Sequence, residues 1–226
     1  MDKTKATIMP NAATNSLPPK TSNHVLGHHL DLRLVRNQWL LIDPGAECLM
    51  SRINEDKTTG DFRELGQRLV EEVSSFLNIK FSSASGNDAY GSFRLIFVGH
   101  SIGNIIIRSA LTDTAMKPYL KNLYTFMSIS GPHLGYLYSS NTLFSSGLWL
   151  FKKLKGSPCM HQLTFTDETD IQSCYLFKLS QEKTFEYFQN IILLSSPQDR
   201  FCKLSYPSPF DKEIGSRSFA YLSFQE

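Results

Sequence analysis

The five residues Gly99-His100-Ser101-Ile102-Gly103 have the types and the spacing of a nucleophile turn. In this pattern, G-x-S-x-G, a sharp strand-to-helix turn pushes the serine hydroxyl out over a sheet. Glycines suit the two outer positions because a Cβ atom there would crowd the turn. The apolar run Leu95–Val98 before it and the apolar segment Ile105–Leu111 after it supply the strand and the helix. The sequence therefore predicts that Ser101 is a nucleophile.

A serine hydroxyl attacks an acyl group only with help from other residues. It requires a histidine base, a carboxylate that orients the histidine, and two N–H donors for the oxyanion. The residue after the nucleophile supplies one donor, so we expect the Ile102 N–H in this role. The second donor normally comes from a loop after an early strand. Gly27-His28-His29 lies at about the right place in the chain, but a polar, proline-containing segment precedes it.

The acid is expected just past a later strand, because the carboxyl ends of the strands form the site in open α/β sheets. Ile191–Ser195 reads as a compact buried strand, and Asp199 follows it closely. Asp199 is therefore the candidate acid, with an ordinary turn aspartate after a proline as the alternative. Asp167 and Asp170 lie in a polar loop and are weaker candidates.

The base is harder to assign, because no histidine follows Asp199 in the usual order of serine, acid and histidine. His100 lies inside the turn, where its ring is carried away from the hydroxyl of its neighbour. His133 follows the third predicted strand and is the candidate for a substitute base, although it can instead order its own loop. His161 is expected at the surface or in a loop. The histidines are His24, His28, His29, His100, His133 and His161.

Strand and helix patterns alternate along the chain, which is typical of a parallel sheet with crossover helices. Asp61 is a plausible N-cap for the second helix, and Pro44 ends the first. Besides the strand before Ser101, strands are expected at 46–51, 123–130 and 191–195. Besides the helix after Ser101, helices are expected over 30–40, 62–77 and 176–188.

Composition excludes several classes of function. The formal charge of +2 and the lack of a basic stripe indicate no nucleic-acid partner. No apolar run approaches the roughly 20 residues of a membrane span, and the first residues contain no apolar core of a secretory signal. The four cysteines form no C-x-x-C pair, which favours reduced thiols in the cytoplasm and no metal. We expect no cofactor.

The chain divides into three parts. Residues 1–23 are polar and contain prolines, so we expect disorder there. Residues 24–199 form the predicted α/β domain, and residues 200–226 are an atypical C-terminal tail. Within the domain, residues 142–154 are apolar and amphipathic, with lysines at the end. They fit a lid over an acyl pocket, a docking surface for a partner or a membrane surface, or a core helix.

Several segments together resemble the plant branch of the putative serine esterase family, a lipase-like family with an α/β-hydrolase fold that is also called domain of unknown function 676. The resemblance implies that Ser101 and Asp199 belong to a triad acting on carboxylic esters, with lipids as the expected substrate class. Its Pro-His-x-Gly loop implies a structural His133. The segments are Gly99–Leu111, Ser128–Tyr138, Ser146–Trp149, His161–Thr164 and Ser196–Asp199.

The chain departs from this family at two places. Family members have a strand and a His-Gly oxyanion motif where this chain has Pro18–Asn23, and a histidine-bearing segment where it has Arg200–Phe210. We therefore expect an α/β-hydrolase fold, mostly parallel and flanked by helices, that is incomplete at both ends. The expected function is a serine esterase whose activity is in question. The alternative is a non-catalytic protein that binds a lipid or a protein, or a truncated isoform.

Overall fold

The computed structural model describes residues 4–10, 32–55, 57–81, 93–135, 156–195 and 218–223. The backbone alone is described for residues 4–10, 81, 195 and 218–223. The apolar segment 142–154 and the candidate acid Asp199 lie outside these ranges, as do His24, His28 and His29.

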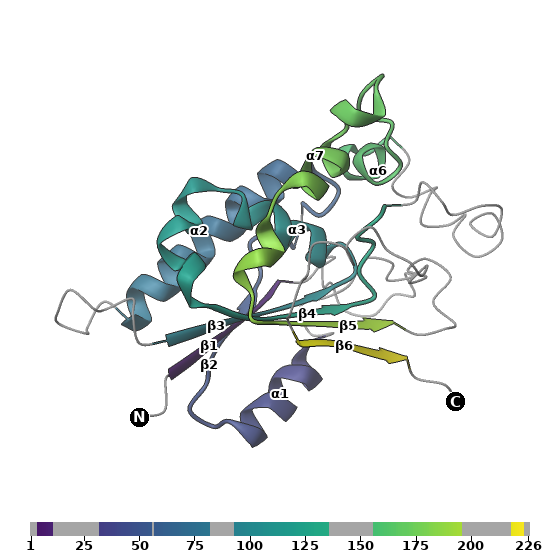
Figure 1. Ribbon diagram of the computed structural model, residues 1–226. Coiled ribbons are helices and arrows are strands. Elements are labelled where there is room, and N and C mark those ends of the chain that lie inside the picture. The colour runs from purple at the N-terminus through teal and green to yellow at the C-terminus, as the bar shows by residue number, and fades with distance from the viewer. Residues whose placement is uncertain are drawn as a thin grey trace, which may run out of the picture.

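Six strands form one sheet in the order β2-β1-β3-β4-β5-β6, and every neighbouring pair is parallel (Figure 1). The expected parallel sheet is confirmed, and the strands expected at 46–51, 123–130 and 191–195 appear as β2, β4 and β5. The strands are β1 Thr4–Pro10, β2 Glu47–Ser51, β3 Phe93–His100, β4 Leu123–Ile129, β5 Asn190–Ser195 and β6 Ser218–Ser223.

Helices cover both faces of this sheet. Figure 1 shows α2, α3 and α7 on one face and α1 on the other. None of the helices in the described ranges is long and apolar enough to cross a bilayer. The α-helices are α1 Arg33–Ile42, α2 Phe62–Phe81, α3 Gly103–Leu111, α6 Pro158–Leu163 and α7 Tyr175–Gln181. The 3-10 helices are η1 Thr114–Asn122, η2 Ile171–Ser173 and η3 Thr184–Tyr187.

Strand β3 separates two hydrophobic cores because its side chains alternate between the two faces of the sheet. Leu95 and Phe97 are completely buried in the larger core, together with residues of α2, α3, α6 and α7. Ile96 and Val98 are buried in a smaller core that is covered by Val35 and Trp39 of α1. Burial on both faces explains why this strand is a continuous apolar run.

Helix α2 begins where the sequence predicts. The Asp61 Oδ1 accepts a hydrogen bond from the Arg63 N–H at 2.6 Å, which is the contact of an N-cap. The Gln162 side chain, in α6, adds a tie to the same helix end. Its Oε1 accepts from the Phe62 N–H and its Nε2 donates to the Asp61 Oδ2, both at 2.9 Å. The start of α2 therefore anchors α6, a hundred residues further along the chain.

The single helix expected over 176–188 is wrong, because α7 ends at Gln181 and Glu182 is extended, with ψ of 132°. The Leu179 carbonyl accepts from Arg108 Nη2 at 3.0 Å and from the Glu182 N–H at 3.3 Å. The Arg108 side chain, from α3, thus bonds a carbonyl that a backbone N–H would bond if α7 continued. Periodicity does not reveal this tertiary contact.

The expectation of disorder over residues 1–23 does not hold for Thr4–Pro10, which form β1 in the interior of the sheet. Ala6 to Pro10 pair with residues of β2, and Thr4 to Ile8 pair with residues of β3. The sequence-based prediction rested on the polar, proline-containing composition of residues 1–23 and missed the short strand within them. Pairing on both sides compensates for that weak local preference, because each neighbour supplies backbone hydrogen bonds.

The C-terminal tail likewise contributes to the sheet. Residues Ser218 to Ser223 form β6, which pairs with β5 from Asn190 to Ser195. The sequence-based description of 200–226 as an atypical tail did not anticipate this strand.

We predict that Ile8→Pro destabilises the folded protein. Because β1 lies between β2 and β3, each of its N–H groups faces a neighbouring strand, and proline removes one of them. The expected loss in the free energy of unfolding is on the order of 3 kcal/mol, measured by urea denaturation. Ile8→Val, which keeps the N–H and favours a strand, is the matched control. Equal stability of the proline variant and the wild type would contradict the placement of β1.

Candidate active site

The turn between β3 and α3 has the geometry that its sequence predicts. Strand β3 ends at His100, α3 begins at Gly103, and Ser101 between them has a φ of 53°. A non-glycine residue seldom adopts this left-handed conformation, and the strain of doing so is typical of functional turns. Ser101 is therefore presented on a turn that surrounding contacts must hold in place.

Two backbone contacts and one side chain hold the turn. The Ser101 N–H donates to the carbonyl of Ile129, at the end of β4, at 2.9 Å. The Ser101 carbonyl accepts from the backbone N–H of Asn104 at 3.2 Å and from its Nδ2 at 2.9 Å. Asn104 is completely buried, and its Nδ2 also reaches the Ile129 carbonyl at 3.4 Å. Asn104 thus links the strained serine to the neighbouring strand.

The glycines around the turn make room for this asparagine. A Cβ added at Gly99 would lie 2.3 Å from the Asn104 Oδ1 and 2.9 Å from the Ile107 Cδ1. A Cβ added at Gly131 would lie 2.8 Å from the Asn104 Nδ2. Both distances to Asn104 are shorter than real carbon contacts allow. The nearest obstacles to a side chain at Gly99 are therefore the side chains of Asn104 and Ile107.

The carboxyl ends of three strands meet beside Ser101. The Ser101 N–H bonds the end of β4, and the Ser130 N–H, just past β4, bonds the Leu194 carbonyl of β5 at 2.9 Å. Strand β5 therefore ends two strands away from the turn, about 10 Å at the usual spacing. Asp199 lies four residues beyond the end of β5 in the sequence, outside the described ranges. Its role as the acid stays a prediction that this topology supports.

The first turn of α3 leaves donors beside the serine. Within the described ranges, the Ile102 N–H makes no backbone hydrogen bond, as the geometry of a helix start leads one to expect. The positive end of the helix dipole lies at the same place. Both features suit the stabilisation of an oxyanion.

Strand β1 changes the expectation for the second oxyanion donor. Ile8 pairs with Phe97, so Pro10 is level with Gly99 and the chain leaves the sheet beside the serine turn. A strand therefore does lead into the region from which a second donor is expected, contrary to the expectation from the sequence. Gly27-His28-His29 is further along and outside the described ranges.

His133, in the loop after β4, contacts a serine hydroxyl and two aromatic rings. Its Nε2 is 2.8 Å from the Ser128 Oγ, and its ring packs edge-on against Phe126 and Phe185 at centroid distances of 6.0 Å. The guanidinium of Arg108 lies over the Phe185 ring at 4.9 Å. These contacts order the loop after β4, which is the alternative considered for this residue.

Electrostatics disfavour His133 as a base. Burial, and secondly the positive charge of Arg108, lower the pKa of His133 to about 3. Burial also lowers the pKa of Arg108, to about 10, so Arg108 stays charged at neutral pH. A base that accepts the serine proton must become a cation, and the neighbouring charge opposes this. His133 fits a neutral structural role better than that of a substitute base.

The remaining candidates have structural contacts of their own. The His161 Nδ1 is 3.0 Å from the Thr166 Oγ1. The Asp167 Oδ2 accepts from the Tyr175 N–H at 2.8 Å, and the Asp170 Oδ2 accepts from the Ser173 hydroxyl at 3.3 Å. Within the described ranges, no side chain hydrogen-bonds the Ser101 hydroxyl, and no cluster of His, Cys, Asp or Glu could hold a metal.

The sequence analysis missed two residues around the turn. Asn104 comes three residues after the serine, a position for which the G-x-S-x-G pattern specifies no residue type. Arg108 is only 1% exposed and is the one charged residue of α3. A lone charge within Ile105–Leu111 was the available signal, because a buried charge requires hydrogen bonds or aromatic partners.

Comparisons with known proteins agree with this geometry. The profile of the family described as "Putative serine esterase (DUF676)" matches residues 22–207. The matched region includes Ser101, Asp199 and every described element from α1 to β5.

Similarity to solved structures is confined to the fold. The chain aligns with AbyA5 wild type at a TM-score of 0.53 and 10% identity, covering 100% of this chain and 54% of that one. It aligns with an acylaminoacyl peptidase of Pyrococcus horikoshii at a TM-score of 0.50 and 14% identity, covering 100% of this chain and 32% of that one. For the Bacillus licheniformis lipase BlEst2 the TM-score is 0.49 and the identity 14%, and the alignment covers 85% of this chain and 65% of that one. The chain thus spans less than two thirds of each of these proteins.

We predict that Gly99→Ala and Asn104→Ala are coupled. Gly99→Ala alone should lower the free energy of unfolding by about 2–3 kcal/mol, because the new Cβ collides with the Asn104 side chain. In an Asn104→Ala background the same change should cost less, since the main collision is gone. Urea denaturation of the two single variants and the double variant gives the coupling. Gly45→Ala, whose Cβ meets nothing closer than 3.9 Å, is the control. Costs that add within about 0.5 kcal/mol would contradict the fit between the two residues.

We predict that His133 makes stability depend on pH. The unfolded chain protonates His133 below about pH 6.5, whereas the folded chain does so only near pH 3. Stability is therefore present above pH 6.5 and is lost as the pH falls toward 3, by at most about 1.4 kcal/mol per pH unit. His133→Gln should make the free energy of unfolding less dependent on pH, measured by urea denaturation between about pH 4 and 7. His161→Gln is the control, and an unchanged slope for His133→Gln would refute the burial of a neutral ring.

Proposed function

Since the chain belongs to the putative serine esterase family, and is of the α/β-hydrolase type, we propose that it is a serine esterase that cleaves carboxylic esters with Ser101 as the nucleophile. The observation that carries the proposal is the left-handed Ser101 at the carboxyl edge of a parallel sheet. Ser130 and Phe165 are left-handed as well, so the φ alone does not carry the proposal. Among these residues, only Ser101 combines it with a place between a buried strand and the start of a helix, as a nucleophile turn requires.

The reaction has two steps. The Ser101 Oγ attacks the ester carbonyl carbon, its proton passes to a base, and the alcohol leaves with a proton. Water then attacks the acyl-enzyme and releases the acid and free Ser101. The Ile102 N–H, at the positive end of α3, stabilises the oxyanion formed in both steps. Asp199, which follows β5, orients the base.

Lipid esters are the proposed substrate class, which rests on the lipase-like character of the family that the sequence resembles. An apolar lid or membrane contact over residues 142–154 agrees with such substrates. The free thiols of Cys48, Cys159 and Cys174 agree with a cytoplasmic location.

A second function is favoured by the surroundings of His133. This histidine is held neutral by burial and by Arg108, and it bonds Ser128, so the described ranges contain no activated base at Ser101. A protein with the same fold and no base would bind a lipid or a protein partner without cleaving it. The two functions are separated by the reactivity of Ser101.

We predict that a fluorophosphonate probe labels Ser101 in the full chain. The probe reacts with an activated serine and traps it covalently. Ser101→Ala should abolish the labelling, while Ser173→Ala, at a serine of η2 outside the turn, should leave it unchanged. In-gel fluorescence with mass spectrometry of the labelled peptide is the measurement. A folded chain that the probe does not label would favour the binding protein over the esterase.

A histidine scan extends this experiment. Each of the histidines is replaced by asparagine, and the labelling rate is compared with that of the wild type. Loss of a triad base lowers the rate by on the order of a thousandfold or more. A loss at a single histidine other than His133 would identify the base. A large loss at His133 would contradict the structural role given to this residue.

A further inference from the structure

Asn104 is a buried side chain with one hydrogen-bonded end and one unbonded end. It is completely buried in the first turn of α3. Its Nδ2 lies 2.9 Å from the Ser101 carbonyl oxygen and 3.4 Å from that of Ile129. Its Oδ1 has no hydrogen-bond partner within the described ranges. The desolvation of a buried acceptor without a partner offsets what such hydrogen bonds contribute to folding. Stability alone therefore does not explain an asparagine at this position.

The place that the Asn104 Nδ2 occupies requires a hydrogen-bond donor. It faces two carbonyl oxygens, which are acceptors, and an amide NH2 group has two hydrogens to donate. An aspartate would bring a third acceptor to the same point. A leucine would leave the Ser101 carbonyl with the backbone N–H of residue 104 alone, at 3.2 Å. The contacts therefore favour an amide over an acid or an apolar side chain.

The Ser101 carbonyl belongs to the same peptide unit as the Ile102 N–H. A peptide unit is planar and trans, so its C=O and its N–H point in opposite directions. A side chain that fixes the direction of the carbonyl therefore also fixes the direction of the N–H. Within the described ranges that N–H makes no backbone hydrogen bond, and it is the expected donor to the oxyanion.

A hydrogen bond to this carbonyl also strengthens the donor on the other side of the peptide unit. Hydrogen bonds in a chain polarise one another, and a protein interior of low dielectric constant increases the effect. Here the first bond runs from the Asn104 Nδ2 to the Ser101 carbonyl, and the second runs from the Ile102 N–H to the oxyanion. Asn104 can thus act on the reacting atoms without touching them.

We propose that Asn104 is a positioning residue for catalysis, which directs and polarises the Ile102 N–H toward the oxyanion through the Ser101 carbonyl. This role rests on the proposed esterase function, because an oxyanion forms at this place only when Ser101 attacks an ester. It gives the burial of the amide a purpose in the transition state, where the position of a donor decides its effect.

Asn104→Ser and Asn104→Ala form a matched pair that differs by one hydroxyl. A serine hydroxyl in a helix can donate to the carbonyl three residues earlier, which at this position is that of Ser101. The same helix already contains such a bond, because the Thr112 Oγ1 donates to the Ser109 carbonyl at 2.7 Å. Both variants leave nearly the same space and lose the contact with Ile129. A difference between them therefore comes from the donor.

The first measurement is the hydrolysis of 4-nitrophenyl butyrate by the full chain, followed by the absorbance of the released 4-nitrophenolate. Asn104→Ala should lower kcat by on the order of tenfold to a hundredfold with little change of KM, because the oxyanion is absent from the bound substrate. Asn104→Ser should recover most of this loss. Wild-type kcat in Asn104→Ala, or equal losses in the two variants, would overturn the proposal.

A second pair keeps this comparison independent of folding. Asn104→Thr and Asn104→Val fill more of the space than serine and alanine do, and they again differ by one hydroxyl donor. Urea denaturation gives the folded fraction of each variant, to which its kcat is normalised. The threonine variant should have the higher kcat. Equal normalised kcat values in this pair would contradict the role of the donor.

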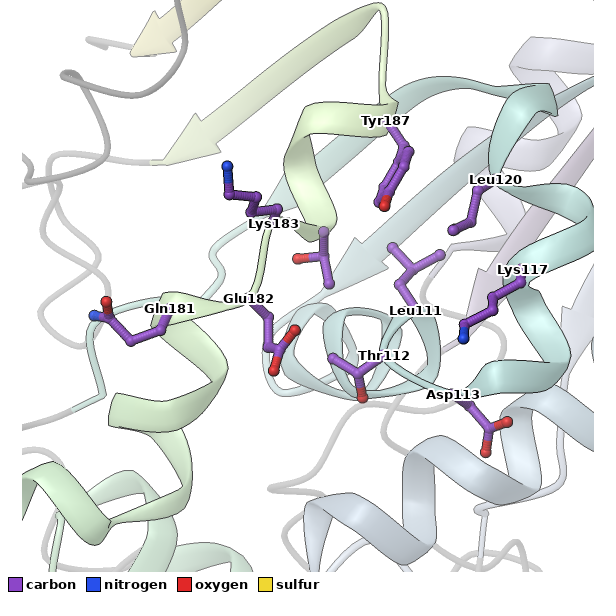
Figure 2. A pocket seen from close by; sticks show the side chains of 10 residues that line it. Leu111, Thr112, Asp113, Lys117, Leu120, Gln181, Glu182, Lys183 and Tyr187 are labelled. Atoms are coloured by element: carbon purple, nitrogen blue, oxygen red, sulfur yellow. The ribbon is translucent and has the colours of Figure 1, made fainter.

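Thr112→Val is the control for a lost hydroxyl bond in the same helix. Figure 2 shows Thr112 among the residues that line a cavity at the other end of α3. At 1.5 Å per residue it lies on the order of 15 Å from Ser101 along the helix. Removal of its bond to the Ser109 carbonyl should therefore leave kcat and KM at their wild-type values. A loss of kcat as large as that in Asn104→Ala would indicate a general effect on the helix and would refute the positioning role.

The ¹⁵N chemical shift of the Ile102 amide tests the same contact without a substrate, because it responds to hydrogen bonding at the carbonyl of its own peptide unit. The signal should move in Asn104→Ala and return toward its wild-type position in Asn104→Ser. An unmoved signal in Asn104→Ala would overturn the inference whether or not the protein hydrolyses esters. Absence of hydrolysis by the wild type would refute the esterase function and the catalytic part of the role, while the shift still decides whether Asn104 holds this peptide unit.

Discussion

The hydrogen bond from the Ser101 N–H to the Ile129 carbonyl, at 2.9 Å, is the contact on which the geometry of this site depends. It fastens a left-handed serine, whose conformation is unfavourable by itself, to the end of the next strand. Asn104 completes the fastening by bonding the Ser101 carbonyl, and it fits only because Gly99 and Gly131 have no side chains. Conformational strain at one residue is thus balanced by buried polar contacts from two other elements.

The same pattern of contacts continues across the carboxyl edge of the sheet. The bond from the Ser130 N–H to the Leu194 carbonyl repeats, between β4 and β5, the one that Ser101 makes between β3 and β4. Strand β1 ends on the other side of the turn, at Pro10. Residues that leave β1 and β5 therefore start on either side of the nucleophile, which is the arrangement that an oxyanion donor and a triad acid require.

Arg108, in α3, contributes both to the packing of the helices and to the electrostatics near the serine turn. Its guanidinium bonds the Leu179 carbonyl, where α7 ends, and lies over the Phe185 ring. Its charge adds to the burial that keeps His133 neutral. A single buried cation thus bonds the end of one helix and contributes, after burial, to the lowered pKa of His133.

The sequence by itself determined the local parts of this protein. The spacing of Gly99, Ser101 and Gly103 specified the turn, and apolar patterns specified α2, β3 and β5, because such features depend on neighbours in the chain. Only the tertiary structure decided the rest. Thr4–Pro10 became a strand because partners on both sides bond its backbone, and α7 ends at Gln181, close to the Leu179 carbonyl that Arg108 bonds. The low pKa of His133 likewise depends first on burial and secondly on the charge of Arg108 in another element, and no local pattern records either.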